Sequence, residues 1–134
     1  MRRRSSEDQQ WQAVKKQVQE RDRNRCRLLK VVTMKQAYKL QKNAGPLLAR
    51  LDAAHIYPVS QNIPMTYEVN NIVLLNRWSH GMLDTCHDPI TGEPITKDEV
   101  YAWWETIAGS KQWQALQNVK EYLDGTRSGE AAKT

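Results

Sequence analysis

Phenylalanine is absent from this chain of 134 residues, and cysteine occurs only at Cys26 and Cys86. Two cysteines so far apart form neither a disulfide framework nor a CxxC zinc pair, so a reducing cytoplasm is the expected compartment. No apolar run approaches the ~18 residues that a membrane span requires, and the longest clear run is Ile72 to Leu75. The basic start, Met1 to Arg4, is followed by no apolar segment, so we expect neither a secretory signal nor a membrane partner.

The charge of the chain is unevenly distributed. Residues 1–50 hold 14 Lys or Arg against 4 Asp or Glu, whereas residues 51–134 hold 6 against 11. A basic run can be an ordinary solvated helix face. It can also contact phosphates, because each Lys or Arg that neutralises a phosphate releases counterions. The second interpretation predicts a nucleic-acid partner, and its candidate contacts are Arg21, Arg23, Arg25 and Arg27.

The length predicts one globular domain, and the alternation of strand-like and helix-like segments predicts an α+β fold. We expect a basic helical region at residues 1–50, a core of two strands and a helix at residues 51–88, a second helical region at residues 89–125, and a disordered tail at residues 126–134.

Hydrophobic spacing and helix-ending residues predict the elements within these segments. A helix with Trp11 on its apolar face is expected from about residue 6 to Arg23. Two short strands are expected around a loop at residues 60–71, in the later part of Leu47–Tyr57 and at Ile72–Leu75. Further helices are expected at Thr33–Lys42, from Arg77 to about Cys86, from the capping box Thr96–Glu99, and from Ser110 to Gly125.

Residues able to carry chemistry gather around the two expected strands. His55 ends the first strand in Ala54-His55-Ile56-Tyr57-Pro58, Asn71 opens the run Asn-Ile-Val-Leu-Leu, and His80 precedes Asp84 by four positions. A neutral imidazole can take a proton from water near pH 7. A His and an Asp four positions apart on a helix share one face and can chelate a divalent ion. A lone His is more often a core residue bonded to a carbonyl, but the combined pattern favours catalysis.

The order strand, loop, strand and helix, together with these motifs, resembles the HNH endonucleases, which cut nucleic-acid backbones with one bound metal ion. The resemblance covers residues 51–84, and Arg21-Asp22 shortly before Cys26 gives weaker support. It implies a ββα-metal (His-Me finger) core with flanking α-helices on both sides. It also implies hydrolysis of DNA phosphodiester bonds, either as nicking or as double-strand cleavage.

The resemblance assigns a role to each residue of the pattern. It implies His55 as the general base, Asn71 as the residue that ties the loop and orients the base, and His80 as a catalytic metal ligand. Asp84 would be a second ligand, and Asn70 could exchange roles with Asn71. The implied cofactor is one divalent ion, Mg²⁺ or Mn²⁺ first and Zn²⁺ or Ni²⁺ as alternatives. Arg77, just before the helix, is a further candidate for phosphate contact.

The chain departs from the commonest family pattern at the position before the base. Many members carry an Asp or His ligand there, and this chain has Ala54. Strand alternation puts Asp52 on the same face as Ala54, so the Asp52 carboxylate or a water molecule could complete the ligand set. His87 and Asp88 are weaker candidates for an extra ligand, because residues that follow a helix are usually just exposed.

A second departure concerns the four-Cys zinc site that often braces this family. Cys26 stands at the expected place, but its partner positions correspond to Leu29, Asn76 and Ser79. We therefore expect no structural zinc.

Two interpretations other than an enzyme remain open at this stage. The protein could be a nucleic-acid-binding or partner-binding module on a degenerate HNH scaffold, or an interaction protein within a DNA-processing machine. If it is a nuclease, cutting both strands requires a homodimer or two encounters, because one small domain has one site. The resemblance implies a bacterial host cytoplasm and a phage or mobile-element origin.

Overall fold

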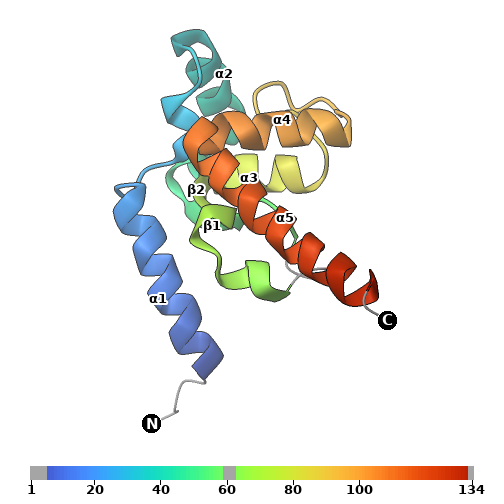
Figure 1. Ribbon diagram of the computed structural model, residues 1–134. Helices are drawn as coiled ribbons and strands as arrows, with labels where there is room; N and C mark the ends of the chain where they lie inside the picture. The colour runs from blue at the N-terminus through green and yellow to red at the C-terminus, as the bar shows by residue number, and fades with distance from the viewer. Residues whose placement is uncertain (1–5, 59–62, 133–134) are drawn as a thin grey trace.

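The computed structural model describes residues 6–58 and 63–132 and has a mixed α+β fold that is mostly helical (Figure 1). This confirms the expected α+β class. The described part contains a two-stranded antiparallel sheet and five α-helices, and none of these helices is long and apolar enough to cross a membrane. The helices are α1 (Ser6–Arg21), α2 (Met34–Ala44), α3 (Arg77–Asp84), α4 (Lys97–Ala108) and α5 (Ser110–Ala132).

The sheet consists of β1 (Leu51–His55) and β2 (Ile72–Asn76), with His55 opposite Ile72 and Leu51 opposite Asn76. Both strands lie where the sequence predicts them. The predicted intervening loop contains short 3-10 turns, and its residues 59–62 lie outside the described part of the chain.

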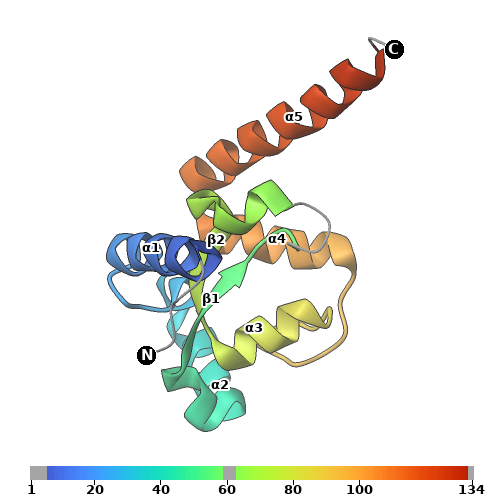
Figure 2. The same ribbon diagram turned by 90° about the horizontal axis from the view of Figure 1, so that it is seen from below.

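Side chains that alternate along β2 pack in two separate layers, because successive residues of a strand point to opposite faces. One face packs against α1 in a small buried cluster of Val14, Val18, Ile72 and Leu74. The other face packs against α3, α4 and α5 in the main core, which includes Ala54, Val73, Leu75, Leu83, Trp104 and Leu116. Figures 1 and 2 accordingly place the sheet between α1 and α3.

Two of the helices begin with a capping box, which satisfies N–H groups that the first turn leaves unpaired. The predicted box at the start of α4 is confirmed, since the Thr96 hydroxyl accepts from the Glu99 backbone N–H and the Glu99 carboxylate accepts from the Thr96 backbone N–H. Thr33 and Gln36 form the same pair of bonds at the start of α2.

Four predicted helix ends differ from the structure, and those of α1 and α2 differ by only two residues, at Arg21 rather than Arg23 and at Ala44 rather than Lys42. Helix α3 ends at Asp84 rather than near Cys86, and Cys86 has a left-handed backbone with φ 58°. Helix α5 continues past Gly125 to Ala132, and both views show its second half projecting away from the body (Figure 2). Gly125 is not among the glycines with positive φ. A glycine inside a helix costs only about 1 kcal/mol, so it does not by itself end one.

Candidate functional site

His80 lies on α3 between two carboxylates. Its Nδ1 is 3.0 Å from Oδ2 of Asp52 on β1, and its Nε2 is 3.3 Å from Oδ2 of Asp84, one turn further along α3. The three predicted metal ligands therefore lie together, although Asp52 is 28 positions from His80. Ala54, the position at which the HNH resemblance would place a ligand, is buried and offers no ligand atom. We call Asp52, His80 and Asp84 the acidic–histidine cluster.

Asp52 also pairs with the cationic side chain of Arg77. Arg77 Nη2 lies 3.0 Å from Asp52 Oδ1, and the Arg77 side chain is half exposed. Partial burial raises the pKa of Asp52, but the hydrogen bonds from Arg77 and His80 outweigh burial and hold the pKa below its ordinary value. The Asp52 carboxylate is therefore charged at neutral pH, as a metal ligand must be.

The donor set of the acidic–histidine cluster, two carboxylates and an imidazole, suits a hard to borderline divalent ion. The side chains form a row, because His80 uses a different ring nitrogen for each carboxylate. In the described parts of the chain, accordingly, no three His, Cys, Asp or Glu side chains already surround one point that could hold a metal ion. The donors fit a metal by their chemistry, and at present His80 is hydrogen-bonded to Asp52 and lies within ion-pair distance of Asp84.

His55 is held by two contacts at the end of β1. Its Nε2 is 2.9 Å from the backbone carbonyl oxygen of Thr66, and its ring stacks on Trp11 of α1 with centroids 5.3 Å apart. A carbonyl oxygen only accepts, so Nε2 carries the hydrogen and donates it. In the neutral ring, Nδ1 is then the atom with a free lone pair, which is what a general base requires.

Asn71 closes the loop that carries Thr66. Its amide oxygen accepts from the Tyr57 backbone N–H at 2.8 Å, and its amide nitrogen donates to the carbonyls of Tyr57 and Met65. The side chain is fully buried. Asn70 instead bonds the neighbouring Glu68, so Asn71 is the residue that ties this loop. By fixing Met65 it also fixes the adjacent carbonyl that holds His55.

The candidate base and the acidic–histidine cluster emerge from opposite faces of β1. His55 is three positions from Asp52, and its ring packs toward α1 whereas Asp52 reaches α3. Among the described residues β1 pairs only with β2, so its other edge, the open edge, has no strand partner there. A phosphodiester lying across that edge could be approached from both faces.

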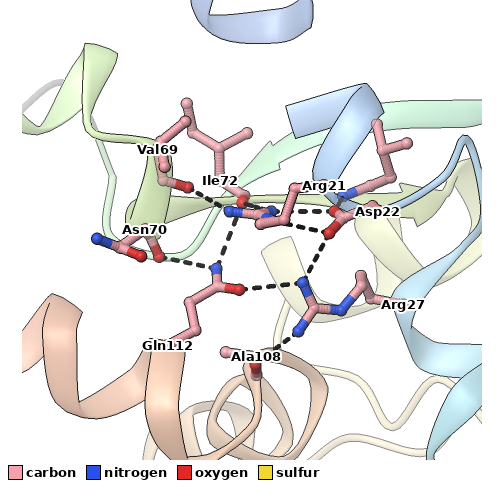
Figure 3. Close-up of polar contacts among 9 residues, drawn as sticks. Arg21, Asp22, Arg27, Val69, Asn70, Ile72, Ala108 and Gln112 are labelled. Atoms are coloured by element: carbon pink, nitrogen blue, oxygen red, sulfur yellow. Dashed lines mark hydrogen bonds and ion pairs between the residues drawn. The ribbon is translucent and has the colours of Figure 1, made fainter. Parts of the chain in front are cut away.

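In the basic segment that begins at Arg21, the partly buried Arg21 and Arg27 both point toward the carboxylate of Asp22 (Figure 3). Asp22 accepts from Arg21, from Arg27 and from the backbone N–H of Leu74. Arg21 also donates to the carbonyls of Val69 and Ile72, and Arg27 to that of Ala108. These bonds cover the edge of β2 that does not pair with β1.

The four arginines of this segment that are predicted to contact phosphate therefore differ in their surroundings. Arg21 and Arg27 use most of their donors within the protein, whereas Arg23 and Arg25 are exposed. Burial raises the pKa of Asp22, but hydrogen bonds from Arg21, Leu74 and Arg27 outweigh burial and lower it overall. The sequence shows the charges of this segment but carries no signal for which of them turn inward.

Three of the four positions at which the HNH resemblance would place a zinc site lie close together. The Cys26 sulfur accepts hydrogen bonds from the backbone N–H and the side-chain amide of Asn76, each at 3.3 Å. The Asn76 amide oxygen also caps α3 by accepting from the Ser79 backbone N–H, and the buried Ser79 hydroxyl has no hydrogen-bond partner among the described residues. Leu29 is 42% exposed. Hydrogen bonds thus link the end of β2 to Cys26, in the segment that follows α1.

His87 and Asp88 have other local partners. His87 Nδ1 lies 3.0 Å from the Thr85 hydroxyl, and Asp88 Oδ1 accepts from the backbone N–H groups of Ile90 and Thr91. Both side chains shape the turn after α3.

Sequence reasoning missed two parts of the site. Trp11 was assigned only to a core-facing helix stripe, and Thr66 acts through its backbone, for which a side chain gives no signal. Comparison with protein-family models, with curated proteins and with solved structures finds no match.

Proposed function

We propose that this protein is a metal-dependent endonuclease that hydrolyses DNA phosphodiester bonds, with β1, β2 and α3 as the ββα-metal core of an HNH enzyme. The observation that carries the proposal is the acidic–histidine cluster. Asp52 comes from the first strand, while His80 and Asp84 come from the helix that follows the second. The anchored His55 at the end of the first strand is the second support.

His55 is the proposed general base. Its Nδ1 takes a proton from the attacking water, while the Nε2–H bond to Thr66 fixes the ring and disperses the charge that the ring gains. Asn71 acts through the loop by holding the backbone next to Thr66 in place. These roles require Nδ1 to face the open edge of β1, where the substrate backbone would lie.

Asp52, His80 and Asp84 are the residues that would hold one divalent ion, with Mg²⁺ or Mn²⁺ preferred and Zn²⁺ or Ni²⁺ as alternatives. Such an ion, when bound, stabilises the charge that develops on the phosphate and on the departing 3′ oxygen. Arg77 holds Asp52 in its charged form, and its exposed guanidinium faces the solvent from which a phosphate would approach. One site per chain predicts nicking by a single chain and double-strand cutting by a dimer or by two encounters.

The test is conversion of supercoiled plasmid by wild type, His55→Ala and His55→Gln, with Mg²⁺, Mn²⁺, Ni²⁺ or Zn²⁺ and with EDTA. The proposal expects nicking that requires a metal and that falls by about 10²–10⁴ in both variants, the range over which a general base contributes. Intact plasmid with every metal, or equal nicking by all three proteins, would overturn it.

A non-catalytic DNA-binding module on the same scaffold is the second candidate. Two observations favour it: Ala54 offers no ligand, and Arg77 occupies one oxygen of the Asp52 carboxylate. This candidate expects salt-sensitive DNA binding that survives EDTA, together with no cleavage under any of the conditions above.

A further inference from the structure

A cavity lined by cationic side chains lies beside the covered edge of β2, away from the acidic–histidine cluster. Its volume is about 610 Å³, and its walls come from the segment after α1, the end of α4 and the first turns of α5. Its charged lining residues are Arg21, Arg27, Lys30, Lys111 and a single acid, Asp22. Because Asp22 is already paired with both arginines, the cavity retains an excess of positive charge.

Donors remain free at this cavity. A guanidinium has five N–H groups, and Arg27 uses three of them, toward Asp22, Gln112 and the Ala108 carbonyl. Figure 3 shows Gln112 orienting Arg27 from one side while its amide nitrogen donates to the Asn70 carbonyl. The arginine is therefore held rigidly with two N–H groups to spare.

The two lysines are exposed and have no hydrogen-bonding or ionic partner within the described residues. Lys30 ends the short 3-10 turn Arg27–Lys30, and Lys111 lies in the first turn of α5. A hydrogen bond from Arg27 to the carbonyl of Ala108, 81 positions away, joins the segments that carry the two lysines. Two exposed ammonium groups and a hydrogen-bonded guanidinium that line the same cavity can neutralise and bind an oxyanion.

The cavity and the candidate base lie at the same end of the sheet. Ile72, whose carbonyl accepts from Arg21 beside the cavity, pairs directly with His55 across the two strands. Neighbouring strands are only about 5 Å apart. The cavity borders the edge of β2 and the proposed scissile bond lies at the edge of β1, so a nucleic-acid backbone that runs round this end of the sheet would bring further phosphates to the cavity.

We propose that this cavity binds a phosphate group of the nucleic-acid backbone, away from the scissile bond, with Lys30, Lys111 and Arg27 as its donors. The choice of nucleic acid as the source of the phosphate rests on the proposed function. The cavity itself is independent of the acidic–histidine cluster and of any metal, so its binding can be measured without cleavage.

The experiment compares the double variant Lys30→Gln/Lys111→Gln with the matched control Lys35→Gln/Lys39→Gln. The control lysines are exposed on α2, and neither pair of lysines has a hydrogen bond or ion pair within the described residues, so both variants lose the same charge and no such contact. Binding of a fluorescently labelled DNA duplex is followed by anisotropy in EDTA over a range of salt concentrations. The cavity variant is expected to bind about tenfold more weakly, with a log–log salt slope smaller in magnitude by about 2. The control should bind within about threefold of wild type.

Equal losses in the two double variants would overturn the proposal, because they would reflect net charge alone. A second arm titrates inorganic phosphate and follows the Gln112 side-chain amide by NMR, with a shift expected in wild type and none in the cavity variant. A phosphate-dependent shift with unchanged DNA affinity would assign the cavity to free phosphate and would also overturn the proposal.

These results separate the cavity from the proposed activity. Loss of DNA binding in the cavity variant supports the cavity even if no metal gives cleavage. If the protein cleaves DNA with a metal and the cavity variant binds DNA as wild type does, the proposed nuclease activity is supported and the proposed phosphate site is overturned.

Discussion

Asp22 and Asp52 are both carboxylates flanked by cationic side chains, yet their surroundings differ. The Asp22 side chain is 0% exposed and is bound by Arg21, Arg27 and a backbone N–H of β2. The Asp52 side chain is 20% exposed and is bound by Arg77, which is 50% exposed, and by His80. Both pKa values are lowered by hydrogen bonds that outweigh burial.

The difference shows that the same kind of ion pair can stabilise the fold in one place and form an adaptable site in another. Removal of one member of a buried ion cluster strongly lowers the stability of the fold, because the remaining charges are left uncompensated in a poorly solvated environment. A partly exposed pair contributes little to stability and can exchange partners with solvent, metal or substrate. Asp22 therefore fits a structural clamp on the edge of β2, and Asp52 fits an adaptable site on the face of β1.

The largest expected effect is on stability. Asp22→Ala should lower the free energy of unfolding by about 3–5 kcal/mol, because Arg21 and Arg27 lose their counter-charge inside the protein. Asp52→Ala should change it by less than about 1 kcal/mol. Urea denaturation followed by circular dichroism measures both, and similar losses in the two variants would remove the distinction between clamp and site.

For DNA cleavage, substitution of Asp52 is expected to have the larger effect and substitution of Asp22 the smaller one. Asp52→Asn is expected to lower the metal-dependent nicking rate by at least the roughly 10–100-fold that loss of a residue supporting a metal ligand causes. Asp22→Asn, assayed at a temperature where circular dichroism shows it folded, should keep the rate within about threefold of wild type. A rate loss confined to the Asp22 variant would contradict both assignments.

A smaller effect is expected at the contact between α1 and the candidate base. Trp11→Ala should lower kcat roughly tenfold with little change in KM, because the His55 ring loses the surface that holds its orientation. Trp11→Tyr keeps an aromatic face and should recover most of the rate. If both variants cleave DNA at the wild-type rate, the stacking of Trp11 on His55 contributes to packing and not to catalysis.

The smallest effect expected is the pH dependence of stability. Because the pKa of Asp22 is lowered on folding, its contribution is present above the ordinary Asp pKa and is lost as pH falls through the lower folded value. Stability measured by urea denaturation should therefore fall more steeply below about pH 4 in wild type than in Asp22→Asn. Parallel curves for the two proteins would show that Asp22 is not the group responsible.

Sequence patterns could predict the elements around the candidate site because local signals define them. Apolar runs bounded by polar and proline-containing segments mark the two strands, and the four-residue spacing of His80 and Asp84 places them on one helix face. Even the contact between Asp52 and His80 follows partly from strand alternation, since Asp52 shares a face with the buried Ala54.

Other features depend on tertiary packing and leave no local trace. The stack of Trp11 on His55 exists only because α1 packs on one face of the sheet, and the Thr66 carbonyl is a backbone group. The arginines near the end of α1 look alike in sequence, and only the fold turns Arg21 and Arg27 inward. The continuation of α5 past Gly125 was missed for a different reason, because glycine is a weak stop signal inside a helix.

Direct titration of Mn²⁺ into wild type and His80→Ala, measured by isothermal calorimetry, tests the central distinction between clamp and site. We expect one ion per chain in wild type and no measurable binding in His80→Ala, with circular dichroism showing both proteins folded. Absence of binding in wild type, or equal binding by the two proteins, would show that Asp52, His80 and Asp84 form an ion-pair relay without a metal-binding function.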